Sequence, residues 1–436
     1  MKASKRCLWV LLCFGFMSSV WAQNQTQVMH PSRHLSPRHR MADLLSRRMA
    51  QPGGQLASAI TCDKSRTWNL GAYPGGTTAA LQSINNFGVA MGWGDVPIEG
   101  GTEVRMIGVP LFGFNAGQWF ESGVSSEDWT GEGGGISDTG MIAGNIMGAN
   151  GWPEAYAWTP NHFGFHLGRY SDDDGSVAIA INHSGMLIVG NSGKLLEDQV
   201  TMRVTPLVWT SKVVWNEGRP TLSWDMHALP TGGWEKPGAV FPGVTLNFWG
   251  GWGVNDLGQI AGDGWTSDEN GNYWEIAVVW TPTARGGWRI QRLSDQSNIA
   301  HNQYTEALAI NNRGEIVGDY WGCTEEACTA LPALWKVNAT GARVGKLTVL
   351  GTLSGAQQGW NVAWGINDLG DVVGVSNDAS GNWLATHWKT KYPSTATVLG
   401  FPGDWSVGFG VNNFGIAVGT YGVGEAPEQA VAVLIH

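Results

Sequence analysis

The sequence lacks the features of a membrane-spanning or nucleic-acid-binding protein. After residue 22 it has no apolar run of the roughly 18 residues that a transmembrane helix needs, so we expect a chain that does not span a membrane. Basic residues are scarce in its body: eight of the 26 lie before residue 62, whereas all but one of the 36 acidic residues follow that point. With a net charge of −10, the chain does not suit nucleic acid as a partner, and it favours neutral or cationic ligands.

The first 22 residues resemble a secretory signal peptide. A positively charged start precedes an uninterrupted apolar run, Leu8–Met17, and Val20-Trp21-Ala22 supplies a cleavage site before Gln23. Residues 23–61 are polar and basic, which predicts a linker or docking arm. We therefore expect a secreted or periplasmic protein with three parts: a signal peptide at 1–22, a linker at 23–61 and a folded domain at 62–436.

Cysteine is also scarce. Only Cys62, Cys323 and Cys328 follow the signal peptide. Cys323 and Cys328 lie close together in the sequence and the expected compartment is oxidising, so we predict a disulfide between them. Cys62 is left without a partner.

Familiar enzyme signatures are missing. The chain has no Gly-x-Ser-x-Gly, no His-Glu-x-x-His and no phosphate-binding glycine loop. A glycosidase or lyase would need a pair of carboxylates. The acidic residues expected on the loop-rich face are Glu99, Glu103, Asp128, Glu132, Asp263 and Asp319. The sequence does not say whether any two of them meet, so a catalytic role stays open and we favour a protein without one.

Glycine and tryptophan, in contrast, are abundant, and the glycines mark a repeat. The phrase is Ile/Val-Asn/Ser-x-x-Gly followed by a short apolar strand that ends in Gly. Its copies are Ile84–Gly92, Ile136–Gly144, Ile181–Gly190, Val254–Gly262, Ile310–Gly318, Ile366–Gly374 and Val411–Gly419. Most of the spacings are near the period of about 40–50 residues that propeller blades have.

Each copy lies in the same pattern of strands. In the fifth, Tyr304–Ile310 predicts a strand, Asn311–Gly314 a type I turn and Glu315–Tyr320 a second strand, with two more strands to follow. Seven such units predict an all-β fold: a seven-bladed β-propeller with four antiparallel strands per blade. The last unit has only three strands, and Thr67–Leu70 is predicted to complete it from the N-terminal side.

The motifs resemble those of the extracellular HAF-repeat family. Leu350–Gly355 matches its LGxLxG element, Ala363–Gly374 its (A/G)INxxGxVVG element and Leu384–Trp388 its HAFLW element, although the His-Ala-Phe itself is degenerate. The resemblance covers essentially all of 62–436. It implies an exported, propeller-like bacterial protein and carries over no catalytic residue.

Tryptophan gives the main functional indication. Five of the 25 Trp residues end third strands, where we expect core packing. Many others are expected in loops of one face, where they either cap the blades or form a ligand surface that stacks on sugar rings. The predicted ligand-binding residues are Trp93, Trp119, Trp152, Trp265, Trp274, Trp321, Trp360, Trp383 and Trp405.

We expect no cofactor and no metal, with Ca²⁺ as an open alternative. Asp268–Asn272 and Asp378–Asn382 place oxygen side chains around a glycine, as cation loops do, but a hairpin turn explains them equally well. Asp172–Gly175 is an acidic cluster that we expect to be a solvated loop.

The favoured hypothesis is a secreted, non-catalytic binding propeller whose partner is a glycan or a protein. Carbohydrate of the cell envelope is the favoured ligand class. The alternatives are a glycosidase or polysaccharide lyase with acidic residues at the channel mouth, and a structural or protein-interaction module of an envelope assembly.

Overall fold

The computed structural model is built from β-strands. It describes residues 61–62, 67–121, 134–159, 163–196, 202–216, 219–233, 248–267, 273–293, 304–323, 328–341, 343–355 and 359–435. Within these ranges, no helix is long and apolar enough to cross a membrane.

The strands form antiparallel sheets, four strands to a unit. Three successive units contain β3 (Ala79–Ile84), β4 (Val89–Ile98), β5 (Gly101–Pro110) and β6 (Phe120–Glu121); β7 (Gly135–Ile136), β8 (Ile142–Met147), β9 (Pro153–Trp158) and β10 (Gly164–His166); and β11 (Gly175–Ile181), β12 (Leu187–Leu195), β13 (Met202–Asn216) and β14 (Arg219–Ala228).

The next two units share an eight-stranded sheet. It contains β15 (Phe248–Val254), β16 (Ile260–Ser267), β17 (Tyr273–Pro282), β18 (Trp288–Arg292), β19 (Tyr304–Ile310), β20 (Glu315–Cys323), β21 (Cys328–Lys336) and β22 (Thr348–Val349). A single parallel pair, Glu275 opposite Tyr304, joins its β15–β18 half to its β19–β22 half.

The last two sheets return to the start of the chain. They contain β23 (Val362–Ile366), β24 (Asp371–Asn377), β25 (Trp383–Lys389) and β26 (Tyr392–Val398); and β27 (Trp405–Val411), β28 (Ile416–Gly422) and β29 (Gln429–Leu434) with β2 (Thr67–Gly71) and β1 (Thr61–Cys62). The strand β2 pairs antiparallel with β29, as predicted.

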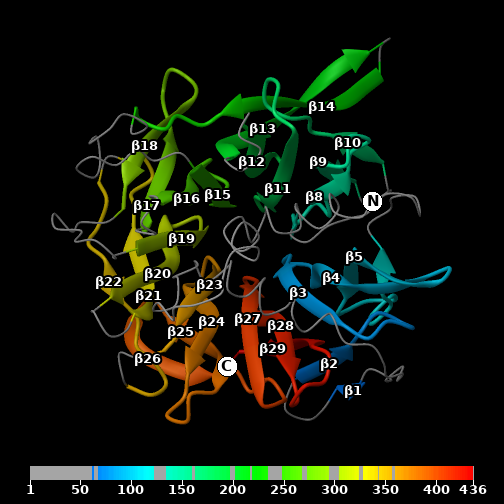
Figure 1. The fold of residues 1–436 in the computed structure, drawn as a ribbon, viewed down its shortest axis with the longest axis vertical. Helices are drawn as coiled ribbons and strands as arrows, with labels where there is room; N and C mark the ends of the chain where they lie inside the picture. Colours follow the sequence, from blue (N-terminus) through cyan, green and yellow to red (C-terminus); the bar gives the residue numbers. More distant parts are fainter. Residues whose placement is uncertain are drawn as a thin grey trace, which may run out of the picture.

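The sheets lie around a common centre, with the β27–β29 sheet beside β3 (Figure 1). The fold is therefore all-β and propeller-like. The β13–β14 hairpin extends away from the ring of sheets (Figure 1), and it carries the exposed Trp215.

Each motif copy forms the turn between the first two strands of its unit. In the sixth copy, the Asn367 side-chain oxygen accepts hydrogen bonds from the backbone N–H groups of Leu369 and Asp371. Gly370 has a φ of 78°, a conformation that favours glycine. Gly374 lies within the strand after the turn, β24, and a Cβ there would lie 2.0 Å from the carbonyl oxygen of Val362. Close approach of two strands thus explains the second glycine of the motif.

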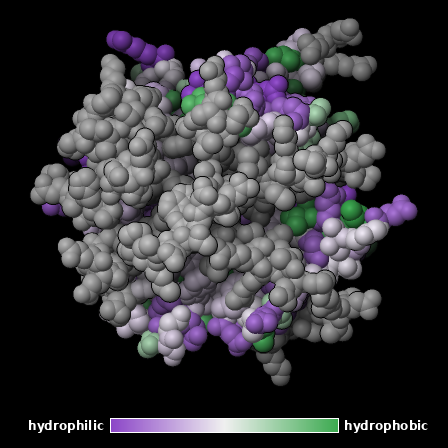
Figure 2. All heavy atoms as spheres, in the orientation of Figure 1, coloured by the Kyte–Doolittle hydropathy of each residue, from purple (hydrophilic) through white to green (hydrophobic). Residues whose placement is uncertain are grey.

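Tryptophans at the ends of third strands pack in the interior, as predicted. Trp158, Trp209, Trp280, Trp335 and Trp388 are all at most 1% exposed. Two of them also fix the segment that follows the fourth strand of the preceding unit: the Trp209 indole donates to the Leu167 carbonyl after β10, and that of Trp388 to the Gly351 carbonyl after β22. On the face drawn in Figure 2, the coloured hydrophobic residues occur in small groups near the rim, interspersed with hydrophilic ones.

Candidate functional site

Most of the predicted ligand-binding tryptophans gather in one place, but they lie in strands more often than in loops. Trp93, Trp265 and Trp321 lie in the second strands β4, β16 and β20. These strands continue beyond the motif glycine, so they include residues that the sequence assigned to loops. Together with Trp360, these residues are between 1% and 8% exposed, so the expected exposed indole surface is not found at these four positions.

These side chains belong to a single cluster, which we call the indole cluster. Its buried tryptophans are Trp93, Trp252, Trp265, Trp321, Trp360 and Trp364, and the half-buried Trp383 and Trp405 pack against it. Trp252 stacks on Trp265 with centroids 6.5 Å apart, and Trp360 contacts Trp383 at 4.8 Å. These tryptophans, which come from several sheets, thus form one hydrophobic group.

The other predicted tryptophans lie elsewhere. Trp119 is half-buried and contacts Tyr73 edge-on at 6.4 Å. Trp152 lies half-buried in the turn before β9. The side chain of Trp274 lies outside the described residues.

The indole cluster adjoins a central cavity of about 250 Å³. The first strand of each motif-containing unit lines it, namely β3, β7, β11, β15, β19, β23 and β27, and the second strands β4 and β8 contribute Trp93 and Asn145. Trp93, Trp252, Trp364 and Phe409 supply aromatic surface, while Asn145 and His183 are among the polar residues. Aromatic walls with a few polar groups are typical of small-molecule sites.

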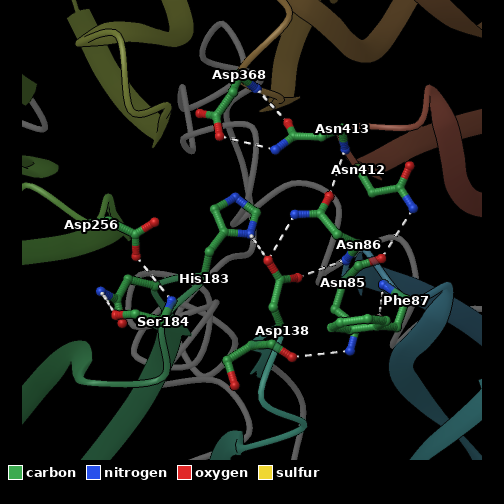
Figure 3. A network of polar contacts seen from close by, with 12 residues as sticks. Asn85, Asn86, Phe87, Asp138, His183, Ser184, Asp256, Asp368, Asn412 and Asn413 are labelled. Atoms are coloured by element: carbon green, nitrogen blue, oxygen red, sulfur yellow. Dashed lines mark hydrogen bonds and ion pairs between the residues drawn. The ribbon is translucent and has the colours of Figure 1, made fainter.

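A network of amide and carboxylate side chains connects the motif turns (Figure 3). The Asn86 side chain donates to Asp138 Oδ2 at 2.8 Å, and the Asn413 backbone N–H donates to Asn86 Oδ1 at 2.8 Å. Asp368 accepts from the side chain of Asn413 at 3.0 Å, and His183 Nδ1 lies 3.6 Å from Asp138 Oδ2. These bonds link the last motif copy directly to the first.

Beside the indole cluster lies a group of acidic residues, which we call the carboxylate cluster. It consists of Asp263 on β16, Glu275 on β17, Glu306 on β19 and Asp319 on β20, each at most 2% exposed. One oxygen from each of the first three lies within 4.8 Å of the others.

Indole groups hold two members of the carboxylate cluster. The Trp252 indole N–H donates to Asp263 Oδ2, and the Trp321 indole N–H donates to Asp319 Oδ2 at 2.5 Å. The carboxylate cluster and the indole cluster are therefore joined by hydrogen bonds. Through Trp252 this network also reaches the central cavity.

Burial determines the electrostatics of this region. Complete burial, followed by the charge of Glu306, raises the pKa of Asp319 well above its ordinary value, and Asp263 adds to the effect. Burial and the charge of Glu275 raise the pKa of Tyr304 to about 12. Asp319 therefore binds a proton far more readily than an exposed aspartate does.

Of the acidic residues that the sequence proposed, only Asp263 and Asp319 come together among the described residues. Glu99 lies exposed in the turn between β4 and β5, and Glu103 pairs with Arg105 at 3.1 Å. Asp128 and Glu132 lie outside the described residues. Sequence analysis missed Glu275 and Glu306, although each lies two residues beyond a tyrosine that begins a strand.

The proposed cation loops are explained by internal bonds where they can be described. Asp378 Oδ1 accepts from the backbone N–H groups of Ser380 and Asn382, and Oδ2 accepts from the Asn382 side chain. The hydrogen bonds from Asn382 lower the pKa of Asp378, so the loop is a capped hairpin. Asp268–Asn272 lies outside the described residues.

The acidic cluster at Asp172–Gly175 is held by cations of this chain rather than merely solvated. Asp173 is 2% exposed and pairs with Arg203 at 2.8 Å. Asp172 pairs with Lys194. The expectation of a solvated loop is therefore wrong for Asp173.

Cys323 and Cys328 lie opposite each other in the register of β20 and β21. Their side chains lie outside the described residues, so the disulfide stays a prediction. The side chain of Cys62 and residues 1–60 also lie outside the described residues, so the signal peptide and the linker stay predictions.

Comparisons with known proteins give no family. No family model matches the chain, and no curated protein matches it. Among solved structures, an oligogalacturonate lyase in complex with manganese is 10% identical with a TM-score of 0.45, over 87% of this chain and 95% of that one. A Pyrococcus horikoshii acylaminoacyl peptidase is 12% identical with a TM-score of 0.46, over 83% of this chain and 52% of that one.

A Trypanosoma rangeli sialidase in complex with the inhibitor DANA is also 12% identical, with a TM-score of 0.39, over 69% of this chain and 54% of that one. The chain thus spans about half the length of the peptidase and the sialidase. At these TM-scores the similarities carry no inference about the activity of this protein.

Proposed function

We propose that residues 62–436 form a seven-bladed β-propeller, exported by the signal peptide at 1–22 and built from repeats of the HAF type. The contacts of β3 with the last sheet, the pairing of β2 with β29 and the bond from Asn413 to Asn86 support closure of the ring. A closed ring leaves no strand edge exposed between its first and last blades.

We propose further that the protein binds a ligand in the central cavity and performs no chemistry there, with a glycan of the cell envelope as the favoured ligand class. The observation that carries this proposal is the group of indoles beside and around the cavity. Indole faces stack on the apolar faces of sugar rings. Trp93, Trp252 and Trp364 provide such faces on the wall of the cavity itself.

The size of the cavity limits the ligand. At about 250 Å³ it is slightly smaller than most ligand pockets, which range over roughly 300–1,000 Å³. It suits one or two sugar rings, or the end of a chain, rather than the side of a long polymer.

The test is a glycan-array screen of the mature protein, followed by titration of any hit and detection by tryptophan fluorescence. Trp364→Phe removes indole surface from the cavity wall and should weaken binding about two- to twelvefold, since an aromatic contact is worth roughly 0.5–1.5 kcal/mol beyond its area. Trp335→Phe is the matched control, because Trp335 is fully buried and does not line the cavity. Equal binding by both variants, or an array without hits, would remove the glycan proposal.

The carboxylate cluster favours a second candidate, a glycosidase or polysaccharide lyase. A protonated acid beside other carboxylates is the pairing that general acid catalysis uses. All four members are buried, however, so a substrate would have to displace part of the indole cluster to reach them. A reducing-end assay on a polysaccharide panel tests this candidate: turnover that Asp319→Asn abolishes would establish it, and no turnover by the wild type would dismiss it.

A further inference from the structure

We propose that the carboxylate cluster is a binding site for a hard divalent cation, with Ca²⁺ as the first choice, and that the bound ion joins the two halves of the eight-stranded sheet. This inference does not depend on glycan binding.

Strand register directs these side chains toward one point. Glu306 lies opposite Asp319 on the neighbouring strands β19 and β20, so their side chains leave the sheet on the same side. Glu275 lies at the parallel pair with Tyr304, two residues before Glu306. Asp263 completes the group from β16, and oxygens of Asp263, Glu275 and Glu306 lie within 4.8 Å of one another. Both halves of the sheet thus contribute ligands.

Asp319 gives an independent indication of a ligand. It is completely buried, and its Oδ1 atom has no hydrogen-bond partner among the described residues, although Oδ2 accepts from Trp321. An unsatisfied carboxylate oxygen in an apolar environment is unfavourable unless a proton or a cation binds it. Asp319 lies opposite Glu306 in the register of β19 and β20, which places it beside the other acids.

The donor atoms select the class of cation. All four side chains offer carboxylate oxygen, which suits Ca²⁺, Mg²⁺ or Mn²⁺ and does not suit ions that prefer sulfur or nitrogen. Ligands on opposite sides of Ca²⁺ lie up to about 5 Å apart, whereas those on opposite sides of Mg²⁺ lie about 4.2 Å apart. Oxygens that lie within 4.8 Å of one another are thus close enough to bind one Ca²⁺ ion together.

The surrounding indoles suit a metal site as well. Trp252 and Trp321 donate to Asp263 and Asp319 and so fix the orientation of these carboxylates. Hydrogen bonds to metal ligands have this role in many metalloproteins. The same indoles would transfer excitation energy to a bound Tb³⁺ ion, which gives the site its own spectroscopic signal.

The experiment uses the full mature chain after dialysis against EDTA. Ca²⁺ is titrated in by calorimetry, Tb³⁺ is followed by indole-sensitised luminescence, and the metal content of the protein before dialysis is measured by mass spectrometry. We expect about one ion per chain, displacement of Tb³⁺ by Ca²⁺ and a higher melting temperature with Ca²⁺. A dialysed protein that binds neither ion and melts at the same temperature with and without Ca²⁺ would overturn the proposal.

Variants locate the ion. Glu306→Gln should weaken Ca²⁺ binding about tenfold or more and reduce the sensitised luminescence, because it removes a charged ligand. Asp378→Asn is the control, since it alters the other aspartate loop and should leave both signals unchanged. If Asp378→Asn abolishes binding while Glu306→Gln does not, the ion lies in the hairpin and the proposal is wrong. Should Glu306→Gln fail to fold, the wild-type titration still decides whether a site exists.

Discussion

Replacing Asn367 by alanine tests whether the motif asparagines hold adjacent units together. Asn367 is 1% exposed, and its side chain makes bonds in two directions. Within its own turn it accepts from the N–H groups of Leu369 and Asp371 and donates to Asp371 Oδ2. Toward the next unit, it donates to the Asn412 carbonyl at 2.7 Å.

The expected loss of stability follows from what remains after the side chain is removed. The buried N–H of Asp371 loses its acceptor, which costs about 1–3 kcal/mol. The bonds to Asp371 Oδ2 and Asn412 O contribute about 0.5–1.5 kcal/mol each. The Asn412 carbonyl keeps the Gly415 N–H as a donor, and the Asp371 carboxylate keeps His387 on its Oδ1 atom. The N–H of Leu369, at an exposed residue, is free to bond to water. The total is about 2–6 kcal/mol, or a melting temperature about 3–8 °C lower for a folded domain of roughly 370 residues.

Thermal unfolding followed by near-UV circular dichroism measures this effect. Asn382→Ala serves as a matched control, because Asn382 is exposed in a hairpin, and we expect its melting temperature to change by about 1 °C or less. Ser137→Ala should have an intermediate effect, since the Ser137 hydroxyl bonds only within its own turn. A melting temperature of Asn367→Ala equal to that of the control would refute the role of Asn367 in joining units.

Three further predictions concern other parts of the fold. Deleting residues 61–71 exposes the edge of β29 and should convert the soluble protein into aggregates, as light scattering would detect; an unchanged melting curve would contradict this. Burial alone would raise the pKa of Asp371, but hydrogen bonds from His387, Lys389 and Asn367 lower it. The ionised Asp371 therefore stabilises the folded state fully above about pH 4, and this contribution is lost as the pH falls toward the folded-state pKa. Asp371→Asn should flatten the dependence of the free energy of unfolding on pH between about 4 and 2, as measured by urea titrations. Gly374→Ala places a methyl group against the Val362 carbonyl and should cost about 2–4 kcal/mol, whereas Gly101→Ala, in open space, should change stability by less than about 0.5 kcal/mol.

The sequence predicted the strands well because the repeat marks the turns between them. The strand predicted at Tyr304–Ile310 is found with the same bounds, and the predicted N-terminal strand pairs with β29. It misplaced Trp93 and Trp265 because nothing in the local sequence shows how far a strand continues past the motif glycine. Strand length there depends on pairing with the third strand, which is a tertiary property.

The sequence alone did not predict the carboxylate cluster. Asp263 and Asp319 occupy the same place in two successive repeats, directly after the motif glycine, and this equivalence was visible. Their proximity to Glu275 and Glu306 depends on how two sheets meet at a single parallel pair. Neither hydrophobic periodicity nor motif spacing predicts the angle and the distance between two neighbouring sheets.

The pairing of β2 with β29 sets the order in which the chain becomes complete. During synthesis or export, β2 emerges long before its partner β29, because the strands β3 to β28 lie between them in the sequence. Until then β2 has a free edge, and closing the intervening loop carries the largest entropic cost of any strand pairing in the protein. A chain that stops before β29 therefore keeps an unpaired strand that invites association with other copies, so the quality of the folded protein depends on β29 being made and paired.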